Sequence, residues 1–175
     1  MPRINKSAEV LKVIAGKRVI VEDELTAARS LLNLFGSNGR RRIIDTAALL
    51  AKQGFVSVGS IDDEKIYKVT PKGIRHLELY TLSKKGVPKP ASWNGTWYMV
   101  TFEIPDSQKV TRNYLTSQLK LQGFVNYTKG LWLYPFDPTT YIKGLRKLLG
   151  LQKEIKVIAV KDFDGSESYK NQFAL

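Results

Sequence analysis

The stretch WYMVTFEIPDS, residues 97–107, is expected to form the first strand of the C-terminal half. It is apolar and aromatic from Trp97 to Phe102 and then presents Glu103, a proline and Asp106. Six strand-forming residues before a proline predict a strand that ends at a turn. Because acidic groups at strand ends also bind divalent cations, the stretch supports two hypotheses. It is either a structural strand end, with Asp106 capping the next helix, or a nuclease site.

The residues after this strand predict a β-α-β-β-α-β order. Apolar residues at helical spacing indicate a helix over residues 107–124, and two short strands follow, joined by a tight turn. A second helix begins with Asp137 as its cap, and a last strand covers residues 154–163. This order is that of a ferredoxin-like domain, in which two helices cover one face of a sheet.

The N-terminal half predicts helices and then a hairpin. Three helices are expected, then two strands joined at IDDE, then a helix that starts with Thr70 and a proline. Their ranges are 7–16, 22–36, 37–54, 55–60, 65–70 and 70–80. The order is typical of a winged helix-turn-helix, so the fold class is α+β. The expected domains are residues 1–82 and 93–175, with a Pro- and Lys-rich linker at 83–92.

Charge and composition restrict the function. The chain has 28 basic and 16 acidic residues, a net charge of +12, which favours a polyanionic partner such as nucleic acid. It has no cysteine, which excludes disulfides and thiolate sites and favours a reducing cytoplasm. No signal peptide or membrane span is expected, and the single histidine, His76, cannot form a multi-histidine metal site.

The third predicted helix carries the candidate DNA contacts. Its apolar residues recur at helical spacing, and its other face is polar or charged. An α-helix fits the DNA major groove, where arginine pairs with guanine, so we expect DNA contacts from this face. The candidate residues are Arg40, Arg41, Arg42, Asp45, Thr46 and Lys52. The alternative is a solvated basic turn. The acidic hairpin tip is expected to lie away from phosphates or to contact another part of the protein.

An ordered set of motifs resembles the PaaX-like family of transcriptional repressors. The motifs are YKVTPKG at 67–73, WNGTWYMVTFEIPD at 93–106, LKLQGF at 119–124 and GLWLYP at 130–135. PaaX repressors regulate phenylacetic acid degradation and combine a winged helix with a domain similar to the small CRISPR-associated subunit, the "Cas-two" fold. The resemblance implies a DNA-binding homodimer whose third helix enters the major groove. The family precedent of an acyl-CoA effector has little support here, because no phosphate-binding glycine loop is present.

The same resemblance bears on Glu103. In the CRISPR subunit an aspartate ends the first strand, and two copies face each other to hold a metal; Glu103 occupies the matching position. No general base is evident nearby in the sequence, so we favour a structural role and expect no cofactor. Under the nuclease or spacer-integration alternative, Mg²⁺ would bind at Glu103 and Asp106.

The C-terminal aromatic residues leave a further choice open. They could stack on unpaired bases, as in RNA-binding proteins of similar fold, or cover a dimer interface. We favour the interface, since in the family the open sheet face pairs with a second subunit. These residues are Trp93, Trp97, Tyr127, Trp132 and Tyr134. The resulting prediction is a cytoplasmic homodimeric repressor bound to duplex DNA. The operator and any effector are not specified by the sequence.

Overall fold

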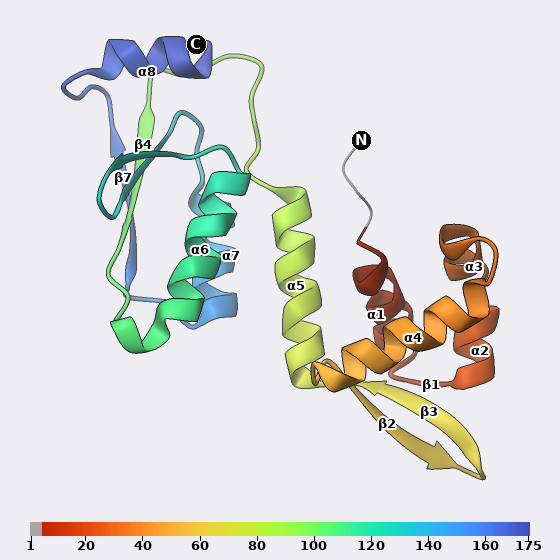
Figure 1. Ribbon diagram of the computed structural model, residues 1–175. Helices are drawn as coiled ribbons and strands as arrows, with labels where there is room; N and C mark the ends of the chain where they lie inside the picture. Colours follow the sequence, from red (N-terminus) through yellow and green to blue (C-terminus); the bar gives the residue numbers. More distant parts are fainter. Residues whose placement is uncertain (1–4) are drawn as a thin grey trace. The chain divides into compact units, whose positions relative to one another are not determined.

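The computed structural model describes residues 5–175, and the chain divides after Tyr80 into two compact units (Figure 1). The division falls within helix α5 (Pro71–Lys85), which continues three residues into the segment expected to be a linker. Beyond α5, Val87 is buried, and its N–H donates to the Gln122 side chain at 3.1 Å. The start of this Pro-rich segment is therefore packed within the C-terminal unit.

The N-terminal unit follows the predicted order with two differences. Among residues 5–70, four helices and three strands precede α5, and the strands form an antiparallel sheet in the order β1-β3-β2. Their bounds are α1 Lys6–Lys17, β1 Val19–Val21, α2 Glu22–Ala27, α3 Arg29–Phe35, α4 Gly39–Lys52, β2 Val56–Ile61 and β3 Glu64–Val69. The third predicted helix corresponds to α4, and the predicted hairpin corresponds to β2 and β3.

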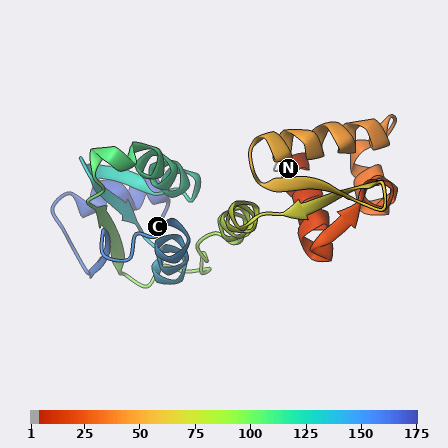
Figure 2. The ribbon, with the colours of Figure 1, turned by 90° about the horizontal axis from the view of Figure 1, so that it is seen from below.

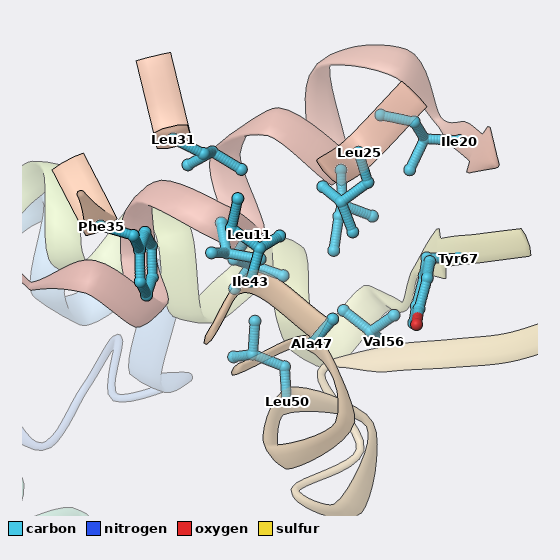
Figure 3. Close-up of a cluster of buried hydrophobic side chains, with 12 residues drawn as sticks. Leu11, Ile20, Leu25, Leu31, Phe35, Ile43, Ala47, Leu50, Val56 and Tyr67 are labelled. Carbon is cyan, nitrogen blue, oxygen red and sulfur yellow. The ribbon is translucent and has the colours of Figure 1, made fainter. Parts of the chain in front are cut away.

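One hydrophobic core joins these elements (Figure 3). Helix α4 presents Ile43, Ala47 and Leu50 to it, and α1 contributes Leu11 and Ile14. These side chains recur every three or four residues, so each helix buries one stripe and leaves the other side to solvent. Burial of this stripe fixes which face of α4 points outward.

The prediction of one helix over residues 22–36 is wrong, because the chain bends at Ala28 and forms α2 and α3. Ala28 has φ −58° and ψ 109°, outside the helical region. Leu25 and Leu31 are both fully buried, yet positions six residues apart would lie about 120° from each other around a continuous helix. The bend brings both leucines into the core. The local sequence has no proline or glycine at this point, so packing overrides helix propensity.

Strand β1 was not predicted, and a partly buried polar contact helps to hold it in place. It pairs with β3 antiparallel, with Ile20 opposite Tyr67. The Tyr67 side chain is fully buried, and its hydroxyl donates to the carboxylate of Glu22 at the start of α2. Lys65 pairs with the same carboxylate at 2.8 Å. This contact links β3 to the residue that follows β1.

The C-terminal unit has the predicted β-α-β-β-α-β order. Its elements are β4 Trp97–Phe102, a short 3₁₀ turn Asp106–Gln108, α6 Lys109–Leu121, β5 Val125–Thr128, β6 Leu131–Tyr134, α7 Thr139–Leu149 and β7 Ile155–Val160. The strands form an antiparallel sheet in the order β5-β6-β4-β7. The Asp137 carboxylate accepts the N–H of Thr139 at 2.8 Å, as expected for a cap of α7. Figure 2 gives a second view of the same elements.

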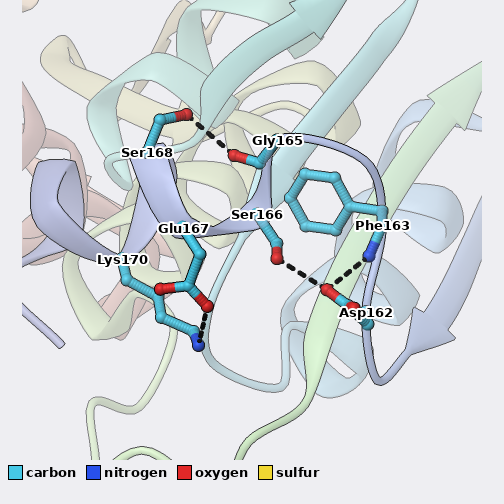
Figure 4. A network of polar contacts seen from close by, with 7 residues as sticks. All are labelled: Asp162, Phe163, Gly165, Ser166, Glu167, Ser168 and Lys170. Atoms are coloured by element: carbon cyan, nitrogen blue, oxygen red, sulfur yellow. Dashed lines mark hydrogen bonds and ion pairs between the residues drawn. The ribbon is translucent and has the colours of Figure 1, made fainter.

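An additional helix, α8 (Ser166–Phe173), packs on the sheet and was not predicted. Phe163, Tyr169 and Phe173 from this segment contact the cluster formed by Trp97, Met99 and Leu133. The chain turns into α8 through Asp162, whose carboxylate accepts from the Ser166 hydroxyl at 2.6 Å and the Phe163 N–H at 2.9 Å (Figure 4). The sheet face expected to be open is therefore covered in part by the chain itself.

This cover corrects the interpretation of the aromatic residues. Trp97, Trp132 and Tyr134 are 0%, 6% and 2% exposed, so they form the interior of the unit rather than a stacking or dimer surface. Trp93 and Tyr127 are half-buried against the same cluster, and Trp93 lies 4.8 Å from the Trp97 ring, measured between centroids. The expectation that Trp97, Trp132 and Tyr134 lie on an open sheet face is therefore wrong. For Trp97 the reason is the missed α8, whereas Trp132 lies opposite Val100 on the other face of the sheet.

Candidate nucleic-acid interface

The outward face of α4 is defined by the residues opposite its buried stripe. At about 100° per residue, Arg41, Asp45 and Lys52 fall within about 40° of one another on that face. All three are exposed. Arg41 and Lys52 are eleven residues apart and therefore lie at opposite ends of the face, separated by about 16 Å along the axis. Three of the six candidates thus share one solvent-exposed surface.

The three consecutive arginines, residues 40–42, have different surroundings. Arg40 and Arg41 are exposed and extend from the first turn of α4. Arg42 is also exposed, but its guanidinium turns back and donates to the carbonyl of Phe35 at 3.2 Å. Arg42 therefore connects α4 to the end of α3, and a guanidinium group has further donors available. Arg40 and Arg41 have no such tie among the described residues.

The structure places Thr46 at the edge of the outward face. It is half-buried, and its hydroxyl donates to the Arg42 carbonyl at 2.7 Å within the same helix. Two residues that sequence reasoning missed lie on the outward face instead: Ala48 is exposed, and Leu49 is 48% exposed. The sequence pattern could have identified them, because an apolar side chain on an otherwise polar helix face is available to contact the methyl group of thymine.

The N-terminus of α4 is electropositive for two reasons. Its N-cap residue, Asn38, has a left-handed backbone and makes no side-chain hydrogen bond to the helix, and the first turn has no acidic residue. The free backbone N–H groups and the helix dipole favour an anion at this end, and Arg40 and Arg41 add two full charges. This end of α4 is therefore suited to an anion.

The hairpin tip has the opposite charge. Asp62 and Asp63 both have positive φ and form the two-residue turn between Ile61 and Glu64. Positive φ at both central residues characterises the turn that suits the twist of a tight hairpin. All four residues are exposed, and in residues 5–175 the three carboxylates have no ion pair. The tip presents three negative charges, which would repel a phosphate backbone.

Glu103 and Asp106 both line an open depression of about 780 Å³ in the C-terminal unit. Glu103 is exposed, and its N–H donates to the Glu154 carbonyl at 3.0 Å. The sequence suggested that Asp106 caps α6, and this is wrong. Its carboxylate instead pairs with Arg112 at 2.7 Å. The Arg112 guanidinium also donates to the Ile104 carbonyl at 2.6 Å. Arg112 therefore fixes the turn after β4.

Residues 5–175 contain neither a group of candidate metal ligands nor a membrane-spanning helix. No three side chains among His, Cys, Asp and Glu come together there in a group able to hold a metal ion. Within the same part of the chain, no helix has the length and apolar character needed to cross a membrane.

Comparison with protein-family models gives one result in the C-terminal unit. Residues 90–171 match the model described as the PaaX protein central Cas2-like domain. A search of curated proteins finds no match to the chain. The matched range covers the whole β-α-β-β-α-β order and most of α8. Residues 90–171 are therefore similar to the PaaX central Cas2-like domain, which confirms the PaaX-like resemblance in that part of the chain.

Proposed function

We propose that this chain is a DNA-binding transcription regulator of the PaaX type, a repressor whose N-terminal unit is a winged helix-turn-helix. The observation that carries the proposal is the outward face of α4, with Arg41 at its uncapped N-terminal end and Lys52 at the other end. Arg40 lies beside this face in the first turn and adds a second charge there. An α-helix fits the major groove, and its N-terminal residues reach base edges and phosphates. In this proposal α4 is the recognition helix.

The face has the chemistry needed for both positioning and recognition. Arg40 and Arg41 supply charge for phosphates and paired donors for guanine, while Leu49 and Ala48 offer apolar contact to thymine. Asp45 lies between the two basic ends and would accept a hydrogen bond from a cytosine amino group. The acidic hairpin tip would stay away from the phosphate backbone, since three carboxylates there would oppose binding.

We further propose that the protein acts as a homodimer joined through residues 93–175. Two copies related by a two-fold axis would bind two half-sites of an inverted repeat. The family match of the C-terminal unit supports this role. Because Trp97, Trp132 and Tyr134 are internal, the contact would use other residues of this unit. Duplex DNA and a second copy of the chain are thus the proposed partners, and no cofactor is required.

The test is to incubate the purified full chain with fragmented genomic DNA, recover the bound fragments and sequence them. Enrichment of an inverted repeat would support a dimeric repressor. Random recovery would oppose it. As a control, a variant with Arg40, Arg41 and Arg42 all replaced by alanine should recover little DNA, and its fold should first be checked by circular dichroism.

A further inference from the structure

A second basic feature of the N-terminal unit lies at the C-terminal end of α4. It is an open depression of about 710 Å³ whose lining includes Lys52, Gln53, Phe55, Lys72 and His76. Two of these are lysines and one is the single histidine of the chain. None of the described residues that line it is acidic. The depression therefore concentrates positive charge beside the last turn of α4.

Lys72 is held in a fixed orientation within this depression. Its ammonium donates to the carbonyl of Gln53 at 2.8 Å and lies 5.1 Å from the centre of the Phe55 ring. An ammonium has three donors, so two are available after the bond to Gln53. Because these two contacts restrict the side chain, binding an anion here would lose less side-chain entropy than binding at a free lysine.

His76 completes the depression from the next turn of α5. Its imidazole stacks on Phe55 at 4.4 Å with an interplanar angle of 21°. Burial lowers the pKa of His76 below its usual range. The charged groups that share the depression with it, Lys52 and Lys72, are both cations. A bound anion would oppose these effects and favour the protonated ring.

Lys52 links the depression to the outward face of α4. It belongs to both surfaces, at the end of the face opposite Arg41. The separation of about 16 Å between these two positions exceeds the major-groove width of about 12 Å, so a helix that crosses the groove would bring its two ends to the two phosphate strands that border it. The depression would then face the strand opposite the one approached by Arg41.

Resting on the proposed DNA-binding function, we propose that the depression formed by Lys52, Lys72 and His76 binds a backbone phosphate of duplex DNA at the far border of the groove. Arg40 and Arg41 contact the near border, and the depression contacts the opposite strand. It contributes affinity without base recognition and fixes the position of α4 along the groove.

The first test measures duplex affinity by fluorescence anisotropy at several salt concentrations. Lys72→Gln is the test variant, because it removes the charge but keeps a donor for Gln53. Arg75→Gln is the control, because it removes a charge from an exposed residue of the same helix outside the depression. The salt slope is the decrease in the logarithm of the binding constant per tenfold increase in salt, and losing one phosphate contact should reduce it by about 0.9. Between 50 and 200 mM salt, the factor by which affinity falls should therefore be about 3.5 times smaller for the variant than for the wild type.

A lower slope in Lys72→Gln alone supports the proposal. Equal slopes in Lys72→Gln and the wild type, or an equal decrease in Arg75→Gln, overturn it. These outcomes leave the proposed function intact, provided that the wild type binds duplex and the Arg41→Ala variant binds more weakly. Absence of duplex binding by the wild type would instead contradict the proposed function as well.

The second test follows the imidazole of His76 by NMR, where one histidine gives one unambiguous titration. Duplex should raise the His76 pKa in the wild type, and the Lys52→Gln, Lys72→Gln double variant should show a smaller increase. A pKa that does not change with duplex would contradict the proposal. An increase with inorganic phosphate alone and none with duplex would also overturn it, by assigning the depression to a free anion.

Discussion

Tyr67 on β3 donates a hydrogen bond to the carboxylate of Glu22, which lies 45 residues earlier at the start of α2. Lys65 pairs with the same carboxylate. These two contacts lower the pKa of Glu22, with the Lys65 contact as the larger cause. The three residues hold the β-sheet against the helices that position α4.

This contact makes the stability of the N-terminal unit depend on pH. Because the pKa of Glu22 is lowered in the folded state, its contribution is present above the unfolded pKa and is lost as pH falls through the folded value. Replacing Glu22 with glutamine should destabilise the unit at neutral pH by roughly 0.5–1 kcal/mol. The difference in stability between the variant and the wild type should become smaller when the pH falls below the ordinary pKa range of glutamate.

The measurement is thermal unfolding by far-ultraviolet circular dichroism from neutral to acidic pH. The three tryptophans lie in the C-terminal unit, so their fluorescence separates its transition from that of the N-terminal unit. Glu64→Gln, at the exposed hairpin tip, is the matched control and should change little. If the stability lost in Glu22→Gln stays constant down to acidic pH, the ionised Glu22 carboxylate is not the source of the stabilisation.

Gly73 should be intolerant of any side chain. A Cβ at this position would lie 2.1 Å from the carbonyl oxygen of Phe55, which is backbone and cannot turn away. Gly73→Ala should therefore destabilise the N-terminal unit by about 3 kcal/mol, through strain between α5 and the start of β2. Gly16→Ala in α1 is the control, because nothing lies within 4 Å of the added carbon.

Urea unfolding followed by circular dichroism would measure both glycine variants. Gly16→Ala should be neutral or stabilising by up to about 1 kcal/mol, since alanine is the better helix former. Equal stability of the Gly73→Ala variant and the wild type would show that α5 does not approach Phe55 as closely as the structure indicates.

Arg41 and Arg42 should differ in what they affect, although they are neighbours. Arg41→Ala should lower duplex affinity and reduce the salt slope by about 0.9 without changing the melting temperature. Arg42→Ala loses its hydrogen bond to the Phe35 carbonyl and should cost about 0.5–1.5 kcal/mol of stability. Anisotropy and thermal melting of both variants, with Arg29→Ala as an exposed control, would separate the two roles. Identical effects in both assays would refute the distinction.

Glu103 is expected to be structural, with neither cleavage nor metal-dependent stabilisation of the wild type. The measurement is a melting curve with and without Mn²⁺, run beside a nuclease assay on single- and double-stranded DNA and RNA. Asp106→Asn tests the second carboxylate of the nuclease alternative, which pairs with Arg112 in the structure. Cleavage together with a Mn²⁺-dependent rise in melting temperature, both lost in Glu103→Ala, would establish the nuclease alternative. A rise without cleavage would indicate a structural ion.

The full chain should be a dimer in solution at micromolar concentration. Light scattering should give twice the mass of the 19.8 kDa chain, because two-fold assembly is expected from the C-terminal unit. Trp97→Ala should reduce the stability of this unit, since its side chain is fully buried within one copy. A monomeric mass for the wild type would contradict the proposed mode of operator binding.

The sequence by itself determined the order of most elements and the apolar face of α4. Helical spacing of Ile43, Ala47 and Leu50 is a local pattern, and so is the two-residue Asp62–Asp63 turn between β2 and β3. Short-range periodicity and turn chemistry specify such features before any distant contact forms. The PaaX-like resemblance of residues 90–171 was also recognisable from ordered motifs.

Tertiary structure alone decided features that depend on residues far apart in the chain. The bend at Ala28 is set by burial of Leu25 and Leu31 together. The cover of α8 over Trp97 and the depression between α4 and α5 likewise require distant segments to meet. A periodic pattern shows which side of a helix is apolar, but packing against other elements selects which side chains are buried, turned back or left free to bind.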